Sequence, residues 1–178
     1  MGINTETLTI RFAAKDEFYE IFRLNHVIFA NEIPQHEKRE DAILQDAFHQ
    51  NNTYVVAWLE NELVGMVCFN PIRPFSLDKK MSDLDAYLPE HTNLVEIRLF
   101  AVKKELRKQG IAIGMLQFLI PELIKAGYDL GVISASLNEL ELYNNIGARS
   151  FGQLVGTKEV PYQPMYFHIS NLKGAFQQ

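Results

Sequence analysis

The chain has almost no cysteine, since Cys68 is the only one in 178 residues. A single cysteine cannot form an intramolecular disulfide, which suits a reducing compartment. Cys68 lies within the apolar run Val64–Phe69 and has no activating neighbour in any recognisable pattern. A buried structural thiol is therefore favoured over a nucleophile.

The chain also lacks an excess of basic residues. Its 17 lysines and arginines are outnumbered by 22 acidic residues, which gives a net charge of −5. An acidic protein without a basic cluster is poorly suited to bind a phosphate backbone, so we expect no nucleic-acid partner. Any site for an anionic cofactor must attract it locally.

Long apolar runs are missing as well. No stretch of about 18 uncharged apolar residues occurs, so no membrane span is expected, and Met1–Glu6 lacks the pattern of a signal peptide. Without a repeat or linker, residues 1–178 are predicted to form a single domain in the cytoplasm. The five histidines show no metal-ligand spacing, which predicts no metal site; they are His26, His36, His49, His91 and His168.

Hydrophobic patterning predicts an α/β domain with a mixed sheet. A helix between two buried strands implies a parallel pair joined by a right-handed crossover, and the remaining strands should be largely antiparallel. One helix should follow Asp16 as its N-cap, and 76–93 should be a loop with one short helix. Strands are expected at 8–12, 54–59, 63–69, 94–102, 131–135, 151–156 and 165–169, and further helices at 110–125 and 137–145.

The most informative segment runs from the strand Leu94–Val102 into the helix that begins near Gly110. The first N–H groups of a helix have no intrahelical partner, and the macrodipole adds partial positive charge at the same end. Small residues at Gly110, Ala112 and Gly114 would let a bulky anion approach the backbone. The alternative is a turn whose glycines only relieve crowding.

This order of elements resembles the GNAT (Gcn5-related) N-acyltransferases. Arg107-Lys108-Gln109-Gly110-Ile111-Ala112 matches their signature loop for the CoA pyrophosphate, and Phe100-Ala101-Val102 matches the strand end that holds the pantetheine arm. In Leu142–Ala148, Tyr143 precedes Gly147 by four residues as in their second motif, with Ala148 in place of a phenylalanine. The resemblance implies a GNAT-like fold with flanking helices and acetyl-CoA or another acyl-CoA as co-substrate.

The resemblance also suggests how acyl transfer to an amine would run. Tyr143 would donate a proton to the departing thiolate; the alternative is a tyrosine that only packs at a helix end. Glu96 is the leading candidate base, since a charged residue in an apolar strand is usually paired or functional. An inert Glu96–Arg98 pair is weighed equally. Ser136 and Asn138 are weaker candidates for cofactor contacts.

A narrower resemblance links Glu96–Val102 to acyl-homoserine-lactone synthases and long-chain N-acyl amino acid synthases. A further set of positions could echo those proteins: Arg23, Val27, Glu32 and Asp46. However, the arginine that they carry within the strand is Leu99 here, and their basic residue after the hairpin is displaced to Arg73.

Three functions are compatible with these patterns. The first is an N-acetyltransferase that acts on the primary amine of a small molecule, amino acid or peptide. The second keeps the fold but uses a longer acyl donor to make an N-acyl amino acid or a signal molecule. The third is a non-catalytic module that binds acyl-CoA. The sequence leaves the acceptor and the oligomeric state open, a homodimer included.

Overall fold

The computed structural model describes residues 7–175, so the segment Met1–Glu6 lies outside the described residues. The chain divides into two compact units: the first comprises residues 7–68 and 99–119, and the second 69–98 and 120–175. Strand β3 (Glu62–Asn70), strand β4 (Leu94–Val102) and helix α2 (Ile111–Lys125) each contribute residues to both units. No described helix is both long and apolar enough to cross a membrane.

The first unit is built on β1 (Leu8–Phe12), β2 (Thr53–Leu59) and β3 (Glu62–Asn70), which are neighbours in the order of the sheet. β1 pairs antiparallel with β2. The turn between β2 and β3 needs a left-handed residue, and Glu60 adopts φ 55° there. Near-continuous apolar sequences make β2 and β3 buried on both faces, as expected for inner strands.

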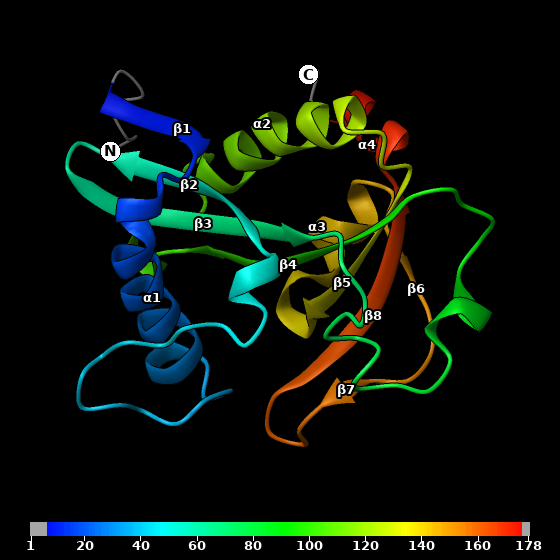
Figure 1. Cartoon of the computed structure of the whole chain (residues 1–178), viewed down its shortest axis with the longest axis horizontal. Helices are drawn as coiled ribbons and strands as arrows, with labels where there is room; N and C mark the ends of the chain where they lie inside the picture. The colour runs from blue at the N-terminus through cyan, green and yellow to red at the C-terminus, as the bar shows by residue number, and fades with distance from the viewer. Residues whose placement is uncertain (1–6, 176–178) are drawn as a thin grey trace. The chain divides into compact units, whose positions relative to one another are not determined.

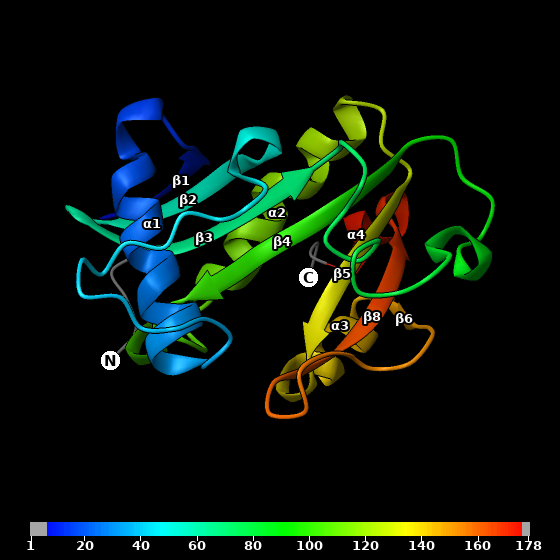
Figure 2. The ribbon, with the colours of Figure 1, turned by 60° about the horizontal axis from the view of Figure 1, so that its bottom comes forward.

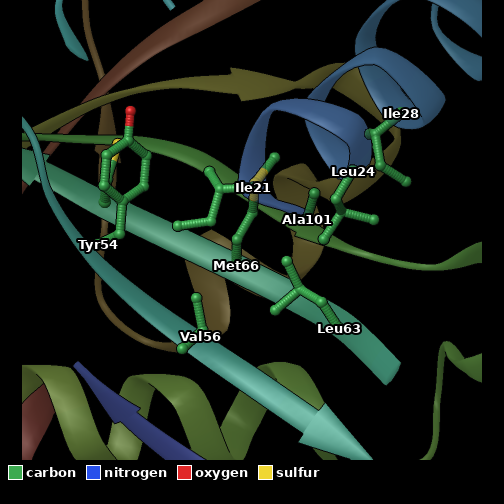
Figure 3. Packing of buried hydrophobic residues seen from close by; sticks show 9 residues of the cluster. Ile21, Leu24, Ile28, Tyr54, Val56, Leu63, Met66 and Ala101 are labelled. Carbon is green, nitrogen blue, oxygen red and sulfur yellow. The ribbon is translucent and has the colours of Figure 1, made fainter. Parts of the chain in front are cut away.

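Helix α1 (Phe18–His26) covers one face of these strands and continues as a π-helix, η3 (Val27–Glu32) (Figure 1). Ile21, Leu24 and Ile28 lie one helical turn apart and pack into a single buried cluster with residues of β2 and β3 (Figure 3). Three partly buried phenylalanines pack against this cluster: Phe18, Phe22 and Phe29. Cys68 belongs to the same core, as expected.

The second unit is built around the antiparallel pair β5 (Leu130–Ser136) and β8 (Pro161–His168), which lie side by side in Figure 2. β5 also pairs parallel with the first residues of β4, from Leu94 to Glu96. Two short strands, β6 (Arg149–Ser150) and β7 (Val155–Gly156), pair with β8. α3 (Leu140–Asn145) follows β5, and α4 (Ile169–Ala175) follows β8.

Two local predictions are wrong. Residues 151–156 do not form one strand, because Gly152 takes φ 61° and interrupts the extended chain between β6 and β7. Asp16 is not an N-cap: it lies inside a short 3-10 helix, η2 (Lys15–Glu17), and α1 begins at Phe18. The carboxylate that accepts a backbone N–H at this entry is that of Glu17, from Ala14 at 2.6 Å.

The predicted fold class is confirmed. In the described residues the strands are ordered β1-β2-β3-β4-β5-β8-β6, with β7 paired to β8. The sheet is mixed and largely antiparallel, with the parallel pair β4–β5 and flanking helices, as in GNAT-like folds. The loop from 71 to 93 contains one 3-10 helix, η5 (Leu84–Tyr87), as expected. The single-domain assignment stays a prediction.

Candidate functional site

The start of α2 presents unused backbone amides. The first intrahelical hydrogen bond runs from Gly114 N–H to Gly110 O (2.9 Å). The amides of Ile111, Ala112 and Ile113 therefore have no acceptor within the helix, and together with the macrodipole they form a concentrated positive end. α2 is 15 residues long, so this end is supported by a full-length helix.

The loop before α2 is bent so that its amides can converge. Lys108 and Gly110 both adopt left-handed conformations, with φ 63° and 86°. Alternation of such residues with ordinary ones turns successive N–H groups toward one point and makes an anion-binding concavity. For Lys108 this conformation costs about 1–3 kcal/mol. A Cβ on Gly110 would meet nothing within 4 Å, so its glycine is required by φ and not by crowding.

Gly114, by contrast, is explained by packing. A Cβ at Gly114 would lie 2.8 Å from Cδ1 of Ile10 on β1, so the absence of a side chain lets α2 approach this strand. Gly65 on β3 has the same role toward α2, since its Cβ would lie 3.0 Å from Cε of Met115. The cofactor contact of Gly114 stays a prediction, but it is not needed to account for this glycine.

Arg107 is held by the protein itself. Its Nε donates to Val102 O at the end of β4 (2.9 Å), and its guanidinium forms an ion pair with Glu32 of η3. The guanidinium thus joins the strand end, the signature loop and the π-helix. The sequence pointed to Arg107 and Glu32 separately and gave no signal that they pair.

Four basic residues surround the loop in this acidic protein. Lys103 pairs with Glu62, and Arg107 pairs with Glu32. Among the described residues, the side chains of Lys104 and Lys108 have no hydrogen-bond or ion-pair partner. These two lysines therefore provide local positive charge that can attract an anion, although the net charge of the whole protein is −5.

β4 is distorted at Leu99, which precedes Phe100, Ala101 and Val102. Leu99 adopts φ 52°, an unusual conformation for a bulky residue that costs about 1–3 kcal/mol. Before Leu99, the parallel ladder between β4 and β5 ends at the pair Glu96↔Val132, although β5 continues to Ser136. The backbone groups of β4 that follow Glu96 have no partner on β5, so they can serve a ligand.

Glu96 is buried and accepts hydrogen bonds from the start of the 71–93 loop. Its carboxylate receives the N–H of Ser76 (3.0 Å), the hydroxyl of Ser76 (2.6 Å) and the N–H of Leu77 (3.1 Å). Arg98 Nε lies 3.4 Å away as an ion-pair partner. Both oxygens are therefore engaged, which favours an anchoring role for Glu96 over proton abstraction. Its role as a base stays a prediction.

Replacement of Glu96 by glutamine tests the anchor. The amide would keep one acceptor oxygen, but its NH2 group would face at least one backbone N–H of Ser76 or Leu77, which also donates, so we expect a loss of about 2–3 kcal/mol in the free energy of unfolding. Urea titration measures the loss. Ser76→Ala, which removes one hydroxyl, should cost only about 1 kcal/mol. An E96Q protein of full stability but low turnover would instead identify Glu96 as a base.

Tyr143 is buried on α3, with 4% of its surface exposed. Burial, assisted by the negative charge of Glu139, raises the pKa of its phenol far above the ordinary value. The hydroxyl therefore stays protonated at neutral pH, as a proton donor must. No described residue forms a hydrogen bond with it. Ser136 begins the short helix before α3 but makes no capping hydrogen bond with its side chain.

Two buried polar groups in the second unit were not foreseen. Asn70, at the end of β3, is fully buried, and its Nδ2 has no hydrogen-bond partner among the described residues. The Oγ atom of Ser134 on β5 is also buried and has no hydrogen-bond partner among the described residues. A lone asparagine or serine in an apolar strand carries no pattern that the sequence could have revealed, yet buried unsatisfied groups often serve a ligand or an ordered water.

The residues that echo the acyl-homoserine-lactone and N-acyl amino acid synthases make separate local contacts. Arg73 pairs with Asp78 and Asp85 within its own loop. Asp46 accepts hydrogen bonds from Phe48 N–H and Asn52 Nδ2. Of this set, only Glu32 contacts the signature loop, through its ion pair. Within the described residues, no group of three or more histidine, cysteine, aspartate or glutamate side chains could hold a metal.

Comparisons with solved structures identify the same fold. A CoA-dependent acyl-homoserine lactone synthase, BjaI, with SAM and isopentyl-CoA, has a TM-score of 0.76 at 16% identity and covers 97% of this chain and 83% of its own. FeeM, an N-acyl amino acid synthase from uncultured soil microbes, has a TM-score of 0.74 at 14% identity over 96% and 95% of the chains.

A third similar structure is a putative N-acetyltransferase from Lactobacillus plantarum, with a TM-score of 0.66 at 14% identity over 92% and 99% of the chains. At such identities these likenesses establish the fold alone. No curated protein matches the chain.

A family comparison goes further than the fold. Residues 15–148, which include the whole of the loop 107–112 and Tyr143, match the acetyltransferase (GNAT) family. The match covers most of the 178 residues. The chain therefore belongs to the GNAT acetyltransferase family.

Proposed function

We propose that the protein transfers an acyl group from acyl-CoA to a primary amine, with acetyl-CoA as the first donor to test. The amine of a small molecule, amino acid or peptide would attack the thioester directly in a ternary complex. The observation that carries the proposal is the set of unused amides at Ile111–Ile113, behind a loop bent by Lys108 and Gly110.

Each part of the first unit has a role in this reaction. The amides at the start of α2 and the side chain of Lys108 would bind the pyrophosphate. The strand end Phe100–Val102 would hold the pantetheine arm, and backbone groups near the distortion at Leu99 would polarise the thioester carbonyl. Arg107, already engaged by Val102 and Glu32, would chiefly fix the loop in its binding shape.

Proton transfer is the second requirement of the reaction. Tyr143 keeps its proton at neutral pH and would give it to the departing CoA thiolate. The attacking amine must lose a proton, and Glu96 has both carboxylate oxygens occupied by the loop. A water molecule that passes the proton to solvent is therefore the simpler acceptor for it.

A longer acyl donor is the second candidate. It is favoured by the similarity, over more than nine-tenths of both chains, to an N-acyl amino acid synthase. The arginine of that group's strand is absent, since Leu99 occupies its position, and Arg73 is bound to Asp78 and Asp85. Because of these differences, acetyl-CoA is preferred over a longer acyl-CoA as the proposed donor. A domain that binds acyl-CoA without catalysis is the third candidate.

Thermal shift with donors of increasing length tests all three. A donor at 100 times its Kd should stabilise the fold by about 2.7 kcal/mol. We expect a shift with acetyl-CoA, and release of free CoA thiol when a panel of amino acids and small amines is added. A larger shift with octanoyl-CoA or palmitoyl-CoA would favour the longer donor, and a shift without thiol release the binding module. No shift with any donor contradicts the proposal.

A further inference from the structure

A cavity in the second unit has no part in the proposed acyl transfer. It is open to solvent on one side and has a volume of about 570 Å³, among the end of α3, β6, the end of β8 and the start of α4. Its position follows from the register of β5 and β8. His168, which lines the cavity, pairs with Leu130 at the beginning of β5. α3 follows the other end of β5, after Ser136, and its last residue, Asn145, lies in the same cavity lining as His168. The volume is that of a small-molecule site.

Three side chains converge on this cavity because of strand geometry. Arg149 of β6 is paired with Tyr166 of β8, and directly paired residues project from the same face of a sheet. His168 lies two residues after Tyr166 and shares that face. The two rings meet edge to face, with centroids 6.3 Å apart. Tyr166 also packs on the core of the unit, so the rings form a supported floor.

The lining is polar and carries positive charge only. It contains one arginine, one histidine and two asparagines and no acidic residue. Within the described part of the chain, the side chain of Arg149 has no hydrogen bond and no ion pair. Its guanidinium is therefore free to bind an oxyanion in the bidentate geometry that arginine favours. Asn145, Asn171 and His168 can each donate a further N–H.

Several carbonyl groups at the end of α3 are already hydrogen-bonded. Its last carbonyl groups accept backbone hydrogen bonds from the turn that follows: Ile146 N–H to Leu142 O (3.2 Å), Gly147 N–H to Asn144 O (3.0 Å) and Ala148 N–H to Tyr143 O (2.9 Å). Gly147 makes this turn with φ 94°, the usual left-handed end of a helix. These three carbonyl oxygens are thus already hydrogen-bonded, which weakens their repulsion of an anion.

We infer that this cavity is a second binding site, which takes a small organic anion whose carboxylate or phosphate group is held by Arg149. The volume exceeds what one oxyanion fills, so the rest of the ligand lies over the rings of Tyr166 and His168. The site is independent of the proposed acyl transfer.

Chemical-shift titration of the full-length ¹⁵N-labelled protein tests the inference. Inorganic phosphate and succinate are the probes for the two oxyanions, and glycerol is the uncharged control. We expect saturable shifts of the Gly147 amide and of the side-chain amides of Asn145 and Asn171 with at least one anion. R149Q should raise the Kd about tenfold, since it removes a charge-assisted bidentate contact. K158Q removes the same charge from an exposed turn of the same unit and should leave the Kd unchanged.

Two outcomes would overturn the second site: no saturable shift at these amides with either anion, or an equal Kd in R149Q. A spectrum of R149Q that is unchanged elsewhere shows that the variant is folded. Stabilisation by acetyl-CoA should be the same in R149Q as in the parent protein. Failure of the anion site and failure of the acyl-CoA proposal are thereby separated.

Discussion

Replacement of Tyr143 by phenylalanine should lower kcat about 100-fold, which is the lower end of what a positioned general acid contributes. The variant keeps the buried ring on α3 and removes only the hydroxyl. Because no described residue forms a hydrogen bond with this hydroxyl, its loss leaves no partner unsatisfied, and the fold should keep its stability. KM for the acyl donor should change little, since the proton is transferred only as the thiolate departs.

The pH dependence distinguishes an acid from a packing residue. Burial raises the pKa of Tyr143 far above its ordinary value, so ionisation of this phenol should not reduce turnover anywhere below about pH 10. Tyr128→Phe is the matched control: this half-buried tyrosine packs against Phe69, and its loss should leave kcat unchanged. Steady-state thiol release measures both variants. Unaltered turnover in Y143F would show that Tyr143 only packs in the core and is not the general acid.

Replacement of Ala112 by glutamate should weaken acyl-CoA binding about 100-fold or more. The new carboxylate would stand in the first turn of α2, among the amides of Ile111–Ile113, where the pyrophosphate is proposed to bind. Like charges brought together in a binding site cost several kcal/mol. At a donor concentration that stabilises the parent by about 2.7 kcal/mol, the variant should gain only about 0.4 kcal/mol.

This substitution separates loss of binding from loss of folding. A carboxylate in the first turn of a helix interacts favourably with the macrodipole by about 0.3–1 kcal/mol. The free A112E protein should therefore be as stable as the parent or slightly more stable. Ala112→Gln adds similar bulk without charge and should keep most of the affinity. Thermal shift with and without acetyl-CoA measures all three proteins. Full stabilisation of A112E by the donor would place the pyrophosphate elsewhere.

The sequence predicted those features that depend on local pattern. The alternation and runs of apolar residues predicted β2, β3, β4 and β5, and the order of strand, loop and glycine predicted where α2 begins. The match of residues 15–148 to the GNAT family agrees with the resemblance seen in the signature loop. Such features could be anticipated because each is fixed by neighbours in the chain.

Features fixed by distant contacts could not be predicted. Glu96 was identified as unusual, but its partners Ser76 and Leu77 are about 20 residues away in a loop without a pattern. The ion pair of Arg107 with Glu32 joins residues 75 positions apart. The strand expected at 151–156 failed because Gly152 turns the chain, and apolar content alone does not reveal a left-handed residue.

The π-helix that ends at Glu32 sets the rotational phase of the acidic partner of Arg107. A π turn holds one more residue than an α turn, as the hydrogen bond from Ile33 N–H to Ile28 O shows (2.7 Å). If the segment wound as an ordinary α-helix, one residue fewer would fit and each later side chain would swing about 100° around the axis. Glu32 would then point away from the guanidinium. The one additional residue of this π turn therefore brings the carboxylate of Glu32 to the guanidinium of Arg107.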